Sequence, residues 1–349
     1  MARAYTAHET DAAADGAGAP AGRPSAVGGG AVRGWRERRW RERGSLRRGW
    51  VLAALALVLA ATMVLHARVP NTVGSLGSLL ETFLPWLGLG VPLLLLGAVL
   101  RKSATAVVAL VLPAVVWAGM FGGLVTDKTG DGGDLTVVTH NVDADNPDPQ
   151  GTARQLAESG ADVLALEELP ARSSQVYERI LAEAYPHREV KGTIGVFSKY
   201  PLTGTAPVEL EIGWTRALRT TVNAPGGQVA VFAAHLPSVR VKVEAGFTAS
   251  QRDDAAEQLG RAIASERLER VVLLGDLNGT MNDRALAPVT AQMRSTQGAA
   301  GAGFGFSWPA SFPLTRIDQI MVRGVEPVSS WTLPATGSDH LPLAASVTL

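Results

Sequence analysis

Three long apolar stretches, at residues 50–67, 82–100 and 103–126, limit the folds that this chain can adopt. Each lacks Asp, Glu, Lys and Arg and has about the 17 to 25 residues that cross a bilayer core. A buried helix of a water-soluble protein is rarely apolar on every face for that length. The first stretch has a signal-peptide alternative with cleavage near Ala61, but two more apolar stretches follow it. We therefore predict three transmembrane helices.

The arrangement of basic residues predicts the orientation of these helices. An Arg-rich run at 33–48 precedes the first stretch, and Arg101 and Lys102 follow the second, whereas the loop between these two stretches offers only Arg68. Cytoplasmic loops carry the excess of Lys and Arg. We expect a multi-pass cell-membrane protein with a cytoplasmic N-terminus, and an odd number of spans then places residues 127–349 outside the cell.

The composition divides the rest of the chain into three parts. Residues 1–49 are rich in Ala, Gly and Arg and predict a disordered cytoplasmic segment, whose Arg-rich run rests on anionic headgroups or, alternatively, binds nucleic acid. Residues 127–133 predict a short linker. Residues 134–349 have ordinary globular composition and enough length to bury a sizeable core, and we expect them to form the catalytic domain.

The charge of residues 134–349 disfavours a nucleic-acid partner, and the absence of cysteine excludes several chemistries. This part carries 18 basic and 24 acidic side chains, a formal charge of −6, although the whole chain is neutral. Nucleic-acid affinity depends on Lys and Arg that displace counterions, so no nucleic-acid partner is expected. The chain has no cysteine, which excludes disulfides, thiolate catalysis and Cys-ligated zinc.

Strand-like and helix-like segments alternate from residue 134 onward. Period-two and continuous apolar runs predict strands at 135–141, 162–168, 193–198, 217–223, 228–235, 271–275, 318–322 and 344–347. Helical spacing occurs at 152–160, 173–183 and 250–265. This mixture favours an α+β domain in which two sheets pack together and helices cover the outside.

Polar side chains collect at the ends of these predicted strands. The residues are Asn141, Glu167, Glu168, His235, Asp276, Asn278, Asp318, Asp339 and His340. Three peptides concentrate them, at 275–278 (GDLN), 316–318 (RID) and 338–340 (SDH). Carboxylates, an amide and an imidazole suit hydrolysis of a phosphate ester or anhydride with a hard divalent cation.

This ordered set resembles the endonuclease/exonuclease/phosphatase family, the DNase I-like fold, over residues 134–349. The motifs are TxNV at 139–142, DVLALEE at 162–168, SKYPL at 198–202, AHLP at 234–237, and the three peptides above. Each motif is weak alone, but their order and spacing are specific. The resemblance implies a four-layer α/β sandwich of two packed mixed sheets flanked by helices.

The resemblance also implies a role for each residue. Glu168 is the expected principal Mg²⁺ ligand, with Asn141 and Asp339 nearby, and Mn²⁺ is the alternative cation. His340 is the expected general base for water, and Asp318 orients it. Asp276 and Asn278 position the water and bind phosphate oxygen, and His235 donates to the phosphoryl oxygens or the leaving group.

Two sequence features leave alternatives open. Many relatives have Gln where this chain has Glu167, so this extra carboxylate either raises the demand for metal or faces solvent. The run 304–309 (FGFSWP) forms either an apolar lip beside the site or part of the core, and its aromatic residues, with Phe312, are the ones expected to meet a lipid tail.

The membrane tether favours a substrate confined to the same surface, because a tether raises the effective concentration of such a substrate. The architecture also resembles membrane-anchored actinobacterial proteins of the VanJ type, which are linked to teicoplanin resistance and implied to act on undecaprenyl pyrophosphate. We therefore expect a lipid-linked phosphate as substrate and no obligate protein partner. The alternatives are a tethered nuclease, a phospholipase C or sphingomyelinase-like phosphodiesterase, and a binding module without activity.

Overall fold

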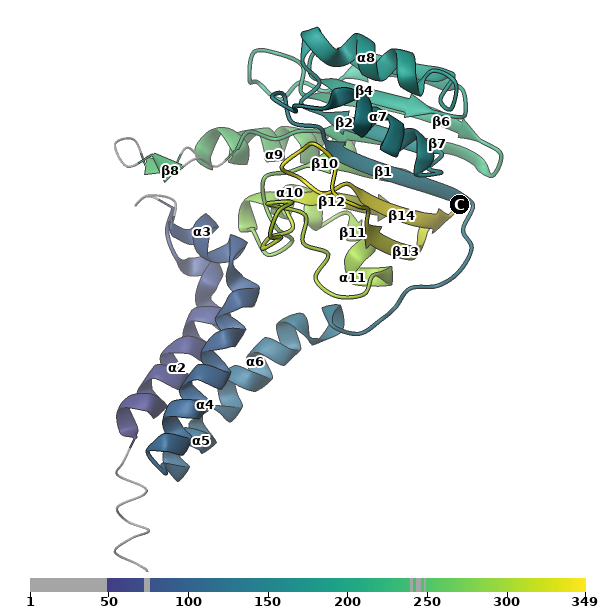
Figure 1. Cartoon of the computed structure of the whole chain (residues 1–349). Coiled ribbons are helices and arrows are strands. Elements are labelled where there is room, and N and C mark those ends of the chain that lie inside the picture. The colour runs from purple at the N-terminus through teal and green to yellow at the C-terminus, as the bar shows by residue number, and fades with distance from the viewer. Residues whose placement is uncertain (1–48, 72–75, 239–240, 243–245, 248) are drawn as a thin grey trace, which may run out of the picture.

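A computed structural model describes residues 49–71, 76–238, 241–242, 246–247 and 249–349 of the chain. The predicted disordered segment at 1–49 lies outside these residues except for Gly49. Figure 1 shows two parts, a bundle of apolar helices and a sandwich of sheets and helices.

The apolar helices occupy the N-terminal third of the described chain. They are α2 (Trp50–Leu65), η1 (His66–Arg68), α3 (Leu76–Thr82), η2 (Leu84–Leu89), α4 (Gly90–Leu100), α5 (Ala104–Ala109), α6 (Val111–Phe121) and η3 (Gly122–Leu124). Two continuous helices, Trp50–Arg68 and Ala104–Leu124, are long and apolar enough to span a membrane. Large apolar side chains such as Leu93 and Val108 are about 70% exposed, which suits contact with lipid rather than water.

The second predicted span differs from a straight helix over 82–100. Its helical part begins earlier, at Leu76, and bends by 70° between Leu76–Thr82 and Leu84–Leu100, so a count of three spans requires this bent pair to be one span. Pro85 stands in the first turn of η2, where its missing N–H needs no intrahelical partner. The proline therefore starts a new helical segment at the bend.

Two six-stranded mixed sheets form the centre of the sandwich. The first has the order β13-β14-β1-β2-β4-β3 and the second the order β11-β12-β10-β7-β6-β5. Their strands are β1 (Leu135–Asn141), β2 (Val163–Glu167), β3 (His187–Lys191), β4 (Ile194–Ser198), β5 (Leu202–Pro207), β6 (Ala217–Ala224), β7 (Gly227–Ala234), β10 (Val271–Asp276), β11 (Arg294–Ser295), β12 (Asp318–Arg323), β13 (Glu326–Thr332) and β14 (Leu343–Thr348). A separate pair joins β8 (Val241–Lys242) to β9 (Gly246–Phe247).

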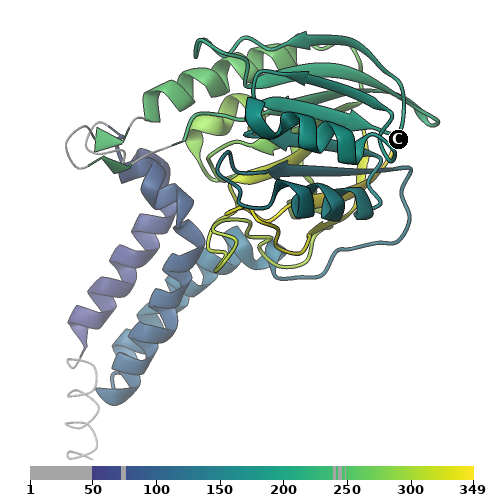
Figure 2. The same ribbon diagram turned by 45° about the horizontal axis from the view of Figure 1, so that its top comes forward.

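Helices cover both outer faces of the two sheets. They are α7 (Pro149–Glu158), α8 (Ala171–Leu181), α9 (Ala249–Ala264), η4 (Arg284–Leu286), α10 (Ala287–Thr290) and α11 (Thr296–Ala300). Alternate strand residues face opposite sides, so Val137 packs between the sheets while Val138 packs with Leu156 and Tyr177 under α7 and α8. On the other side, Leu259 of α9 joins the cluster over the second sheet. These layers confirm the predicted DNase I-like four-layer sandwich, and Figure 2 shows helices on both sides of the sheets.

Aromatic side chains join the sandwich to the apolar helices. Phe306 stacks on Trp86, with 5.7 Å between ring centroids, and on Phe304, at 5.1 Å. Trp117 of α6 lies 6.3 Å from Phe304, and the Trp86 indole donates to the Leu314 carbonyl at 2.7 Å. The two phenylalanines of the 304–309 run thus dock on the apolar helices, an arrangement that neither predicted alternative described.

A set of hydrogen bonds, which we call the polar clasp, also fixes α3 to the loop that follows β10. Arg252, fully buried on α9, donates to the Ser78 hydroxyl at 3.2 Å and to the Asn278 carbonyl at 2.9 Å. Thr280 donates to the Glu81 carbonyl at 3.1 Å. The loop that carries the predicted site residue Asn278 is therefore held against a segment of the apolar helices.

Candidate active site

Strand register brings the predicted site residues to one edge of the sandwich. In the antiparallel pair β10 and β12, Asp276 lies opposite Asp318. In the parallel pair β1 and β2, Asn141 lies beside Glu167, so Glu168 follows directly at the same end. The two sheets pack face to face, and their ends converge on one hollow.

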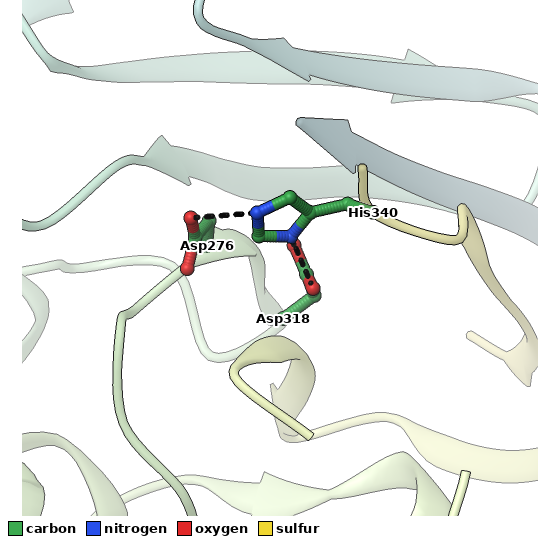
Figure 3. A group of neighbouring side chains, drawn as sticks. All are labelled: Asp276, Asp318 and His340. Carbon is green, nitrogen blue, oxygen red and sulfur yellow. Dashed lines mark hydrogen bonds and ion pairs between the residues drawn. The ribbon is translucent and has the colours of Figure 1, made fainter. Parts of the chain in front are cut away.

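His340 and Asp318 form the best-defined pair of the site (Figure 3). The His340 Nδ1 lies 2.9 Å from Asp318 Oδ2, and the Ser307 hydroxyl donates to the same oxygen at 2.6 Å. On the other side of the ring, Nε2 lies 3.9 Å from Asp276 Oδ2 and 3.8 Å from Asp339 Oδ1. The imidazole is thus fixed through Nδ1, and its Nε2 faces two further carboxylates.

The surroundings shift the pKa values of these groups in different directions. Burial favours neutral His340, but the charges of Asp318, Asp276 and Asp339 and the bond to Asp318 outweigh it and raise the pKa of His340 to about 10. Burial also opposes ionised Asp318, but His340 and Ser307 hold its pKa below the usual value. Burial and the charge of Asp318 raise the pKa of Asp276 to about 7. The carboxylates around His340 therefore carry more negative charge than this one imidazolium neutralises.

Asp276 is the hub of the hydrogen bonds in the site. It accepts from the Asn141 amide at 3.1 Å and from the Asn278 backbone N–H at 2.9 Å. Asn278 adopts a left-handed φ of 47°, and its amide donates to the Leu236 carbonyl at 3.0 Å. His235 Nε2 lies 3.6 Å from Asp276 and 3.5 Å from Glu168, and burial lowers the pKa of His235 so that this imidazole is neutral.

Glu168 and Asp339 are the accessible carboxylates of the site. Glu168 has a φ of 57°, which ends β2, and its side chain is 34% exposed. The Asp339 side chain is 58% exposed and accepts from the Trp308 indole at 3.1 Å. Both carboxylates therefore have oxygen atoms available to a ligand.

A pocket of about 490 Å³ lies at these strand ends, and we call it the strand-end pocket. Asn141, Glu168, Asp276, Asn278, Asp339 and His340 line it, together with Asp143, Ser238, Trp308, Thr315 and Ile317. The remaining two predicted residues, His235 and Asp318, do not line it but contact residues that do. All eight predicted site residues are therefore adjacent in the structure.

The sequence did not predict the opposite wall of the strand-end pocket. That wall consists of Ser78, Leu79 and Thr82 of α3 and Phe83 at the bend. Ser307 and Trp308, which bind Asp318 and Asp339, were also missed as partners. The only sequence signal was their place in the aromatic run 304–309, which says nothing about hydrogen bonding.

Glu167 neither faces solvent nor reaches the pocket. Its side chain is fully buried, and one oxygen accepts from the Thr139 hydroxyl at 2.9 Å. Burial raises its pKa well above the usual value and so favours the neutral acid inside the fold. The alternative of a solvent-facing carboxylate is wrong, because the alternation along β2 turns Glu167 inward and Glu168 toward the pocket.

The oxygen atoms of the strand-end pocket fit a divalent cation. Glu168, Asp276, Asp339 and Asn141 offer the carboxylate and amide oxygens that Mg²⁺ prefers, and the raised pKa of Asp276 shows negative charge that a cation would relieve. Asp276, Asp318 and His340 also have ligand atoms within 4.8 Å of one another. A cation among these three would replace the 2.9 Å bond between His340 and Asp318, so the donor set with Glu168 is the better fit.

Comparisons with known proteins agree with this geometry. The model of the Endonuclease/Exonuclease/phosphatase family matches residues 138–340. No curated protein matches the chain. Similar solved structures include a Staphylococcus aureus beta toxin (16% identity, 61% of this chain and 99% of the toxin covered, TM-score 0.50), a functionally unknown conserved protein from Enterococcus faecalis V583 (16%, 61% and 99%, TM-score 0.51) and D. rerio TDP2 complexed with single strand DNA product (20%, 62% and 99%, TM-score 0.52). At these identities the structures show a shared fold.

Proposed function

The chain belongs to the Endonuclease/Exonuclease/phosphatase family of metal-dependent phosphoesterases, and from that premise we propose that it hydrolyses a lipid-linked phosphate at the outer face of the cell membrane. The narrowest form of the proposal is a pyrophosphatase for undecaprenyl pyrophosphate or a similar cell-envelope lipid, with a role in glycopeptide resistance such as that of VanJ-type proteins.

One observation carries the choice of a lipid substrate. The strand-end pocket has carboxylates on one wall, and the other wall combines the apolar side chains of Leu79 and Phe83 with the hydroxyls of Ser78 and Thr82. The second wall belongs to the bent segment that continues into the apolar helix α4. A substrate in this pocket touches polar groups with its phosphate and apolar side chains with the rest. A phosphorylated lipid has groups that contact both walls, its phosphate on the first and its chain on the second. A soluble nucleotide matches only the first wall.

Each side chain at the pocket has a separate role in the proposed hydrolysis. His340 is placed to take a proton from the attacking water through Nε2, because Asp318 holds Nδ1. Asp276 and Asn278 position that water and the phosphate, since the Asn278 backbone N–H fixes the Asp276 carboxylate. Neutral His235 does not line the pocket, and it holds the carboxylates of Glu168 and Asp276, 3.5 and 3.6 Å from its Nε2, in place for the reaction.

A divalent cation held by Glu168, Asn141 and Asp339 would offset the charge that develops at phosphorus and add positive charge beside His340. The second effect matters because an imidazole with a pKa of about 10 is protonated at neutral pH and accepts no proton. Added positive charge lowers that pKa toward the range of a general base. We propose Mg²⁺ as the cation and Mn²⁺ as a substitute.

The orientation supports the same substrate. The Arg-rich run at 33–48 and the pair Arg101 and Lys102 favour a cytoplasmic N-terminus, and the catalytic domain then faces outward. The formal charge of −6 on residues 134–349 opposes binding of a long polyanion. No nucleic acid and no obligate protein partner belong to the proposal.

The test uses the full-length protein in detergent micelles with Mg²⁺ or with a chelator. Its substrates are undecaprenyl pyrophosphate, sphingomyelin and supercoiled plasmid. We expect Mg²⁺-dependent phosphate release from the pyrophosphate, which His340→Ala abolishes and His187→Ala, a histidine of β3 outside the pocket, preserves. Plasmid nicking without lipid turnover would make the protein a tethered nuclease. Cleavage of sphingomyelin alone would make it a phospholipase C-like phosphodiesterase.

A further inference from the structure

A second, smaller cavity lies between the sandwich and the apolar helices, beside the strand-end pocket. Its volume is about 230 Å³, and Thr82 at the end of α3 lines both spaces. The wall from the apolar helices contains Pro85, Met120, Phe121 and Leu124. We call this space the Arg316 cavity, after the one arginine among its lining residues.

Arg316 is the unusual residue of the wall that the sandwich contributes to this cavity. The residue is only 7% exposed, and none of its three guanidinium nitrogens has a hydrogen-bond partner among the described residues. Gln319, fully buried in the same wall, has a side-chain oxygen without a partner, and its nitrogen donates to the Arg316 carbonyl at 2.9 Å. A buried guanidinium without hydrogen-bond acceptors is strongly unfavourable, so its retention points to a ligand that supplies the missing acceptors.

The nearest acidic residue in sequence does not supply them. Asp318 already accepts from His340 at 2.9 Å and from Ser307 at 2.6 Å. The side chain of Arg316 lies instead on the side of the Phe304–Phe306 loop, where a Cβ at Gly305 would come within 3.0 Å of Nη1. Arg316 therefore lies beside the aromatic contact with the helices, near enough to Asp318 to interact with its charge but without a hydrogen bond to it.

The chemistry of the cavity selects an oxyanion attached to an apolar body. A guanidinium is a planar fork that matches phosphate or carboxylate oxygens in pairs. Around it, Phe304, Phe306, Phe121, Met120 and Leu124 offer apolar surface. The volume is below the roughly 300 to 1,000 Å³ of sites that enclose a drug-sized ligand, so a headgroup or part of a chain fits rather than a whole lipid.

The position of the cavity identifies the source of this oxyanion. Met120, Phe121 and Leu124 stand at the domain end of the candidate span Ala104–Leu124, the depth at which lipid headgroups lie. We propose that the Arg316 cavity binds the phosphate of an anionic membrane lipid at a site separate from the catalytic one. The bound headgroup would neutralise Arg316 and join α6 and η3 to the sandwich.

Thermal unfolding of the full-length protein in dodecyl maltoside tests this site. The additives are phosphatidylglycerol, zwitterionic phosphatidylcholine and sodium phosphate. A ligand that binds only the folded state raises the melting temperature. We expect phosphatidylglycerol to raise the melting temperature by several degrees, and phosphatidylcholine to leave it unchanged. The free energy of unfolding should rise by about 1.4 kcal/mol for each tenfold of ligand concentration above the Kd.

Variants assign the response to Arg316. Arg316→Gln should lose the shift and Arg316→Lys should retain part of it. Arg294→Gln, at an exposed arginine paired with Glu326, should keep all of it. Leu124→Trp, which leaves Arg316 in place and fills the cavity, should also lose the shift. In lipid-free detergent we expect Arg316→Gln to melt no lower than the parent, because the variant removes an unpaired buried charge.

Two results would overturn the proposal. A phosphatidylglycerol shift of parental size in Arg316→Gln would show that the lipid binds elsewhere. A parent without any anion response, combined with a strongly destabilised Arg316→Gln, would make Arg316 a structural residue. If sodium phosphate alone reproduces the shift with the same dependence on Arg316, the oxyanion site is confirmed and its assignment to a lipid is wrong.

Discussion

Two of the three aspartates within 4 Å of the His340 ring, Asp318 and Asp276, have opposite shifts of pKa. Asp318 bonds to Nδ1 at 2.9 Å and has a lowered pKa, whereas Asp276 lies 3.9 Å from Nε2 and has a pKa of about 7. The difference arises because Asp318 contacts a positively charged partner directly and Asp276 is buried near the charge of Asp318. Asp318 is therefore held as an anion that orients the ring. The protonation of Asp276, in contrast, changes readily when a charged ligand binds nearby.

Asp318→Asn tests the orienting role at the scale of one residue. The amide keeps the size of the side chain but not its charge, so His340 loses the anion that stabilises its protonated form. We expect kcat for phosphate release to fall by about 10² to 10⁴-fold, the usual contribution of a positioned general base. Asp254→Asn, at an exposed aspartate of α9, is the control, and a kcat near the parental value in Asp318→Asn would contradict the assignment.

Neighbouring glutamates provide a second residue-scale test. Glu168 lines the strand-end pocket, whereas Glu167 is buried and bonded to Thr139. We expect Glu168→Gln to raise the Mg²⁺ concentration for half-maximal activity by about 10 to 100-fold or more, the range for groups that support a metal site. Glu167→Gln should leave it within about threefold. Equal effects of the two substitutions on a Mg²⁺ titration would remove Glu168 from the proposed ligands.

At the scale of elements, the strands that the sequence failed to predict share a position. Apart from the separate two-residue pair of β8 and β9, they are β3, β5, β11 and β13, each at the edge of a six-stranded sheet, whereas all eight predicted strands are interior. Edge strands bury fewer side chains, as the mostly exposed or half-buried residues of β3 and β5 show, so their apolar pattern is weak. Pro207 and Pro327 weaken it further. The sequence thus predicted the centre of each sheet but not its borders.

The site was predictable for a related reason. Interior strands have clear apolar patterns, and the polar residues that follow them stand out as strand-end groups. The wall from α3 was not predictable, because Ser78 and Leu79 lie about 200 residues from Asn278 and have no pattern that marks a contact. Only the packing of the bent segment against the β10 loop brings them to the pocket, through bonds such as Arg252 to Ser78.

Two leucines of α3 test the function of this wall. Leu79 lines the strand-end pocket, whereas Leu76 on the same helix does not, and both are substantially exposed. We expect Leu79→Ser to lower kcat/KM for the lipid substrate about tenfold, since a lost leucine contact costs about 1.5 to 3 kcal/mol. Turnover of soluble bis(4-nitrophenyl) phosphate should stay within twofold, and Leu76→Ser should change neither. An equal loss with both substrates would argue against lipid contact at Leu79.

At the scale of the whole molecule, the catalytic domain and the apolar helices form one structure rather than an enzyme on a loose tether. Two kinds of contact join them, the aromatic stack of Trp86 on Phe306 and the polar clasp of Arg252 on α3. The linker at 127–133 is thus one of several connections. The active site therefore has a defined position relative to the ends of the apolar helices.

Labelling of single cysteines tests the proposed orientation of this structure. The chain has no cysteine, so Asp131→Cys in the linker and Ser45→Cys before the first span introduce unique thiols. We expect a membrane-impermeant maleimide to label Asp131→Cys in intact cells and to label Ser45→Cys only after permeabilisation, as the basic residues predict. The reverse pattern would place the catalytic domain in the cytoplasm.

The wall of α3 has a consequence for how the reaction rate should be expressed. If the substrate is a membrane lipid, as we propose, an active site built partly from a segment of the apolar helices meets it by lateral diffusion, and the relevant concentration is then the mole fraction of substrate in the surface and not its molarity in the bulk. Addition of inert detergent at constant total substrate should therefore slow the enzyme in proportion to the dilution. An enzyme that drew its substrate from water would show no such surface dilution.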